Sequence, residues 1–219
     1  MKSETHMYVG AAASLAILQP TGIDGTLVSI AGGMLGGWLC DIDVNSKSDI
    51  GDYFAGTEMV IIVGAMAVAD FVFGFGAIEN AIANKSMLNF AGLAAFLLLG
   101  ILGAKSPILS SHRTFMHSFL AVALFSGALF LAYPSIVLPF AIGMLLHELL
   151  DLLNKQGVQL LFPLTFKPCF KLCKPDGTVD RIIRNLAVAV TILLAVWCLA
   201  GGIVDSSSLA RMVSESQLP

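Results

Sequence analysis

Charged residues are scarce in this chain of 219 residues. Asp, Glu, Lys and Arg together make up 12% of it, whereas a soluble globular domain averages about 25%. Such a chain cannot cover a water-facing surface with charge, so a soluble domain is excluded. Intrinsic disorder and a broad basic face for nucleic acid are excluded for the same reason. We therefore expect no nucleic-acid partner.

Cysteine is also sparse. The four cysteines are scattered as Cys40, Cys169, Cys173 and Cys198, which excludes a small secreted module held together by disulfides. Cys169 and Cys173 lie four residues apart, but there is no second cysteine pair to complete a zinc knuckle.

Apolar residues, by contrast, are abundant: they make up 57% of the chain, and the mean hydropathy is +0.85. A membrane-spanning helix needs roughly 20 mostly apolar residues. Five segments meet this requirement: Glu58–Ala77, Ser86–Ala104, Phe115–Tyr133, Ser135–Leu153 and Ile182–Gly202.

Two shorter apolar stretches, Met7–Leu18 and Thr26–Cys40, precede them and are separated by the turn-forming Gln19–Gly25. They predict a short helical hairpin. We expect an all-α, polytopic membrane bundle of about seven helices, with one embedded domain over residues 1–203 and a polar C-terminal tail over 204–219.

The longest polar connection, Asn154–Arg181, carries four lysines and an arginine. By the positive-inside rule this connection is cytoplasmic. Counting the crossings backward then places the N-terminus, every histidine and four carboxylates at cytoplasmic helix ends. These residues are His6, Asp41, Asp43, His112, His117, His147, Glu148 and Asp151.

His147 and Asp151 have the spacing that puts two side chains on one face of a helix, about 5–6 Å apart at Cβ. Such a pair can chelate a divalent ion, and it can equally be a helix cap or a simple hydrogen-bonded pair. Glu148 points about 100° away from His147 around the same helix, so it ranks below Asp151 as a ligand.

A second polar group, His112, Arg113 and His117, lies at the entry to an apolar segment. Ionisable residues at membrane depth are functional candidates because burying them in lipid is costly. The alternative is a cytoplasmic cap with Arg113 extended toward lipid headgroups. That alternative suits His117 less, because this residue is about one turn into the apolar segment.

Asp41 and Asp43 end the second short apolar stretch, where the helix dipole disfavours a carboxylate. A bound ion or a basic partner would offset that cost, and a solvated loop is the alternative. His6 opens the first stretch, and taken alone it would be a solvated histidine.

Histidine and carboxylate ligands without thiolate suit a divalent metal, zinc first and manganese as the alternative. The set could hold one ion with an open position, or two ions about 3.5–4 Å apart. Arg113 would then be a clamp for a phosphate oxygen.

Four motifs carry a resemblance to a known family: T-H near the start, G-G-W-L-C-D-I-D, H-R-T-F-M-H-S and H-E-L-L-D-L-L-N-K-Q-G-V-Q-L-L-F-P. In this order they resemble the YdjM-type inner-membrane proteins, described as LexA-regulated, membrane-bound metal-dependent hydrolases. The likeness runs from His6 to about Pro163. It implies an inner-membrane location, a link to the SOS response, and seven polar signature positions: His6, Asp41, Asp43, His112, His117, His147 and Asp151.

The chain departs from the family pattern at four positions: Cys40, Val44, Met116 and Asn154. Val44 stands where the family has a histidine, which removes one potential ligand near Asp43. More distantly, the His-x-x-x-Asp helix looks like the all-helical zinc phospholipase C and nuclease group, which points toward phosphoesters.

Two functions follow from these patterns. The first is a metal-dependent hydrolase that acts on a phospholipid or another amphiphilic phosphoester at the cytoplasmic leaflet, with Arg113 and Glu148 as catalytic candidates. The second is a non-enzymatic membrane protein, either an ion carrier or a stress-related structural factor. A carrier needs ionisable residues along a path through the bilayer, and Asp70, the deepest, is expected to be a packing residue. The stretch Leu160–Phe166 is a candidate interfacial lid or anchor.

Overall fold

The computed structural model describes residues 1–43, 87–105 and 113–216, together with the isolated residues 64, 68, 71, 72 and 74. Of these, the side chains at 43, 104, 105 and 202–216 are left undescribed. The segment expected to span at Glu58–Ala77 therefore lies almost entirely outside the described residues.

The described residues form six α-helices and three short 3-10 turns, which confirms the all-α prediction. The helices are α1 (Ser3–Leu18), α2 (Gly22–Leu39), α5 (Met87–Lys105), α6 (Phe119–Ala132), α7 (Val137–Leu152) and α8 (Thr178–Ser216). The turns are η1 (Cys40–Asp43), η2 (Phe115–His117) and η3 (Pro134–Ile136). Three helical segments are long and apolar enough to cross a membrane: Gly22–Ile42, Pro134–Leu152 and Thr178–Gly201.

The N-terminal hairpin forms as expected, but its helices are longer than their apolar stretches. The turn between them is reduced to three residues, beginning at Gln19, whose backbone is left-handed at φ 43°. At the start of α2, the Thr26 hydroxyl donates to the Gly22 carbonyl at 2.6 Å. Helix α2 therefore begins four residues before its apolar run, which starts at Thr26.

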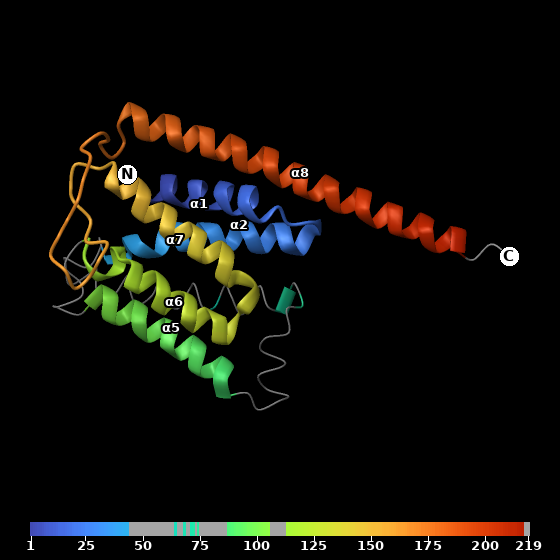
Figure 1. Ribbon diagram of the computed structural model, residues 1–219, viewed down its shortest axis with the longest axis horizontal. Coiled ribbons are helices and arrows are strands. Elements are labelled where there is room, and N and C mark those ends of the chain that lie inside the picture. Colours follow the sequence, from blue (N-terminus) through green and yellow to red (C-terminus); the bar gives the residue numbers. More distant parts are fainter. Residues whose placement is uncertain are drawn as a thin grey trace.

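The helices are layered around a central group of α1, α2 and α7 (Figure 1). Helix α8 crosses over α1 on one side, and α6 followed by α5 covers the other side. Helix α8 continues through Ser216, so the backbone of the expected tail is helical as far as that residue.

Glycines allow the three central helices to approach at backbone distance. A Cβ atom built on Gly10 would lie 2.2 Å from the carbonyl oxygen of Gly33, and one on Gly36 would lie 2.1 Å from that of Phe140. Gly143 faces the Gly33 carbonyl in the same way, at 2.3 Å. Small residues at helix crossings are the usual route to close packing in membranes, where lipid removes the hydrophobic drive between helices.

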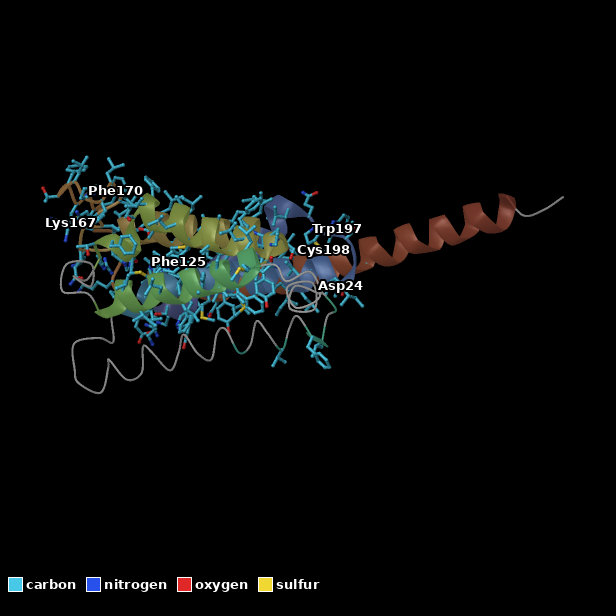
Figure 2. The ribbon with its side chains drawn as sticks, turned by 90° about the horizontal axis from the view of Figure 1, so that it is seen from below. Asp24, Phe125, Lys167, Phe170, Trp197 and Cys198 are labelled. Carbon is cyan, nitrogen blue, oxygen red and sulfur yellow. The ribbon has the colours of Figure 1, made fainter. Side chains whose placement is uncertain are left out.

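The core beside this group is aromatic, and the outer surface is apolar. Phe96 packs edge-on against Phe125 and Phe140, with ring centroids 5.3 and 6.0 Å apart. On α8, by contrast, Leu193 and Trp197 are exposed, as expected of a face that contacts lipid. Figure 2 shows Trp197 and Asp24 toward one end of the bundle, and Lys167 and Phe170 at the other.

Candidate metal centre

Five predicted ligands from four separate parts of the chain meet at one end of the bundle. His6 comes from the start of α1, Asp41 from η1, His117 from η2, and His147 and Asp151 from the last turns of α7. Four of them are at most 1% exposed, and the Asp41 side chain is 13% exposed. The structure therefore brings together residues up to 145 positions apart in a buried polar cluster.

The first group is His6, His147 and Asp151. His6 Nε2 lies 3.2 Å from Asp151 Oδ1, and His147 Nε2 lies 3.9 Å from Asp151 Oδ2. The two imidazole rings stack with centroids 3.8 Å apart. The i, i+4 spacing on α7 thus places imidazole and carboxylate together, as the sequence predicted.

The second group is Asp41, His117 and His147. Asp41 Oδ1 lies 3.6 Å from His147 Nε2 and 3.9 Å from His117 Nε2, and the two Nε2 atoms are 3.3 Å apart. In each group one ligand atom per residue lies within 4.8 Å of the others. Because His147 belongs to both groups, they form one continuous centre.

Hydrogen bonds to surrounding groups orient the cluster. His147 Nδ1 lies 2.7 Å from the carbonyl oxygen of Gly37. A carbonyl can only accept, so Nδ1 donates to it, and Nε2 faces the cluster. The Ser3 hydroxyl donates to Asp41 Oδ2 at 2.6 Å, and the Asn154 amide donates to Asp151 Oδ1. Partners of this kind fix ring tautomers and carboxylate directions in metal sites.

His117 is positioned by the turn before α6 instead of by the helix itself. It lies in η2, and Ser118 caps α6 by accepting from the Ala121 amide at 3.2 Å. The sequence placed His117 about one turn into the apolar segment that begins at Phe115, but α6 begins only at Phe119, so His117 precedes the helix. The imidazole is nonetheless fully buried.

Arg113 points inward. Its side chain is 11% exposed, one terminal nitrogen lies 3.3 Å from Asp151 Oδ2, and the other donates to the Gln156 carbonyl at 2.9 Å. An arginine extended toward headgroups would be solvent-exposed, so the alternative considered for Arg113 does not match this geometry. The guanidinium instead balances part of the charge of Asp151.

Glu148 is fully buried. The Cys40 thiol donates to its Oε1 at 3.7 Å. The side chains of Asp43, His112 and Asp70 lie outside the described residues, so their predicted roles stay predictions.

Burial favours the neutral form of the His6 imidazole. His6 precedes the apolar part of α1, and burial together with the nearby His147 lowers its pKa to about 4. Desolvation disfavours the charged form of an imidazole. A neutral ring has a free lone pair, which is what coordination of a cation requires.

Sequence reasoning missed the residues that orient the ligands. Gly37 acts through its backbone carbonyl, which no side-chain pattern reveals. Asn154 had a signal, because it lies three residues after Asp151 at the end of the same helix. The Thr5 hydroxyl donates to Asp180 at 2.7 Å and joins the start of α1 to α8. Thr5 belongs to the T-H motif, but no pattern in the sequence pairs it with Asp180.

Comparison with known proteins identifies one family. The family model of the YdjM inner membrane proteins matches residues 1–208 of the chain. No curated protein and no solved structure matches the chain.

Proposed function

Since the chain belongs to the YdjM inner membrane protein family, we propose that it is a membrane-embedded, metal-dependent hydrolase that acts on a phospholipid or another amphiphilic phosphoester. The observation that carries the proposal is the meeting of three imidazoles and two carboxylates in one buried cluster. The lysine-rich connection after α7 supports a cytoplasmic position for this end of the bundle.

The donor set fits a divalent cation. The Nδ1 atom of His6 is buried without a hydrogen-bond partner in the described part of the chain, while its Nε2 atom lies 3.2 Å from Asp151. Unmet polar groups in a buried site are costly unless something binds them. Imidazole nitrogen with carboxylate oxygen suits zinc, and manganese second. The ligands would be His6, Asp41, His117, His147 and Asp151.

A divalent ion held by these residues would supply Lewis-acid stabilisation of a phosphoryl or acyl oxygen and would lower the pKa of water. The remaining chemistry belongs to the protein. Arg113 places a fixed positive charge at the edge of the cluster, and its buried Nε has no hydrogen-bond partner among the described residues. It would orient a phosphate oxygen. Glu148, buried one position along α7 from His147, is the candidate for holding or moving a proton.

Position favours an amphiphilic substrate. The cluster lies where α1, α2 and α7 have their ends, beside the connection to α8 (Figure 1). Ends of membrane-spanning helices lie at headgroup depth. A substrate anchored in the leaflet would present its phosphoester at this depth.

Metal content tests the centre directly. We expect Asp151→Asn and His147→Ala to lose the metal that copurifies with the detergent-solubilised protein, measured by mass spectrometry. Asp24→Asn is the matched control, because Asp24 is exposed toward the other end of the bundle (Figure 2). Unchanged metal content in both cluster variants would refute the centre.

Activity separates the hydrolase from the non-enzymatic alternative. Purified protein in liposomes should release a phosphorylated headgroup or inorganic phosphate in a metal-dependent manner, and Asp151→Asn should abolish the release. Metal uptake into sealed proteoliposomes without lipid turnover would favour a carrier. Metal binding with neither activity would favour a structural role.

A further inference from the structure

The connection between α7 and α8, here called the α7–α8 loop (residues 153–177), exposes large apolar side chains although it is not helical. Five of them are between 53% and 69% exposed: Leu161, Leu164, Phe166, Phe170 and Leu172. Exposed apolar area costs roughly 25 cal/mol per Å² in water. Contiguous patches of this kind mark interaction surfaces.

Lysines are interleaved with these apolar residues. Lys155, Lys167, Lys171 and Lys174 are all exposed. Among the described residues, none of the four forms an ion pair with a carboxylate. Figure 2 shows Lys167 and Phe170 together at the end of the molecule. The surface therefore combines unpaired positive charge with large apolar groups.

The loop is tied to the bundle by backbone hydrogen bonds. The amides of Phe170 and Leu172 donate to the carbonyls of Leu152 and Leu153, at 2.7 and 2.9 Å. The Phe119 amide, at the start of α6, donates to the Leu160 carbonyl at 3.0 Å. These bonds fix both ends of the segment that carries the apolar side chains, one to the start of α6 and the other to the end of α7. They therefore set the depth of these side chains in the membrane.

The same loop forms part of the wall of the metal centre. The Gln159 amide donates to the Arg113 carbonyl at 3.2 Å, and the Arg113 guanidinium donates to the Gln156 carbonyl. Phe162 packs edge-on against Phe115, two residues before His117. A change in the position of the loop would therefore move Arg113 directly.

We propose that the α7–α8 loop is seated in the leaflet, with its apolar side chains at the headgroup–acyl boundary and its lysines paired with anionic lipid phosphates. Apolar insertion combined with lysine attraction to anionic lipid is the usual basis of interfacial binding. The partner is the anionic lipid surface itself. This inference stands apart from the hydrolase, because its evidence lies in the loop and not in the metal ligands.

Depth-dependent fluorescence quenching tests whether the α7–α8 loop lies in the leaflet. The parent is the full chain with Trp197→Phe, which leaves Trp38 as background, and Leu164→Trp adds an indole at an exposed position. Both proteins are reconstituted into phosphatidylcholine vesicles with and without phosphatidylglycerol. We expect brominated lipid to quench the added indole, aqueous iodide to spare it, and phosphatidylglycerol to increase the lipid quenching.

Two further variants complete the test. Phe170→Trp should behave like Leu164→Trp, which guards against a local effect of one substitution. Changing the four lysines to Gln together should remove the increase caused by phosphatidylglycerol. Quenching by iodide but not by brominated lipid would overturn the proposal, because the loop would face water. Protection from both quenchers would also overturn it, because protein would then cover the loop.

Discussion

Replacing Gly37 with alanine should damage the proposed metal centre although it replaces none of the proposed ligands. Gly37 lies near the end of α2, where the backbone of α1 passes close to it. An added Cβ would lie 2.4 Å from the carbonyl oxygen of His6 and 2.8 Å from its carbonyl carbon. The contacted atoms are backbone, so no side chain can rotate away to make room.

The size of the effect follows from the geometry. Ordinary contact for a Cβ begins at 3.4 Å, so α1 must move from α2 by about 1 Å. The displaced residue is His6, whose Nε2 lies 3.2 Å from Asp151. Metal sites tolerate displacements of only about 0.5 Å, and disturbing the groups that orient ligands costs roughly 10–100-fold in metal affinity. Overpacking should also cost about 1–3 kcal/mol of stability.

The assay measures zinc affinity by competition with a chelator, and thermal unfolding in the same detergent. Gly127→Ala is the matched control, because a Cβ there meets nothing within 4 Å. This glycine is inside α6, so its replacement should leave affinity unchanged and stabilise the helix by about 0.5–1 kcal/mol. If Gly37→Ala binds zinc as tightly as Gly127→Ala, the link between helix approach and the metal centre is wrong.

Three substitutions test neighbouring parts of the site. Thr5→Val removes a buried bond to Asp180 and should cost about 1–3 kcal/mol in thermal unfolding; an unchanged midpoint would show that this bond is unimportant. Ser118→Ala removes the cap of α6 and should cost about 1 kcal/mol, whereas Ser118→Asn should retain it; equal loss in both would contradict the capping role. Arg113→Lys should keep the bound metal but weaken phosphate binding, measured by calorimetry, because lysine lacks the planar fork; loss of metal instead would make Arg113 a structural residue.

Local sequence patterns predicted the parts of this structure that depend on local physics. The spacing of His147 and Asp151 determined that they share a helical face, and apolar runs located most of the described helices to within about four residues at each end. Helix α8 is the exception, because it continues for 14 residues beyond its apolar run, from Gly202 to Ser216. Helix ends are less predictable than helix centres, because a helix can include polar residues that flank its apolar run.

The sequence did not predict in the same way which helices lie next to one another. Nothing in the apolar pattern specifies which helices are neighbours, because lipid and protein are both apolar surroundings. The available signal was the set of paired glycines from Gly32 to Gly37, which marks a face of α2 that approaches other backbones. The inward turn of Arg113 depends on the carbonyl of Gln156, and a backbone carbonyl leaves no trace in sequence.

The charges of the cluster affect the order in which a divalent cation and a phosphate bind. The described cluster contains two carboxylates, Asp41 and Asp151, and two cationic groups, the Arg113 guanidinium and the amino group of Met1, which lie 3.3 and 3.5 Å from Asp151. Because both cations contact Asp151, an anionic phosphate that approaches the cluster at Asp41 would meet an uncompensated carboxylate among the described residues. At about 4 Å and an effective dielectric near 20, one like-charge pair costs about 4 kcal/mol. A divalent cation would make the site positive, so we expect it to bind before the phosphate. Calorimetry with inorganic phosphate should therefore detect binding to zinc-loaded protein and none to protein stripped by a chelator. Equal affinity in the two states would show that Arg113 alone recruits the anion and that the metal plays no part in substrate capture.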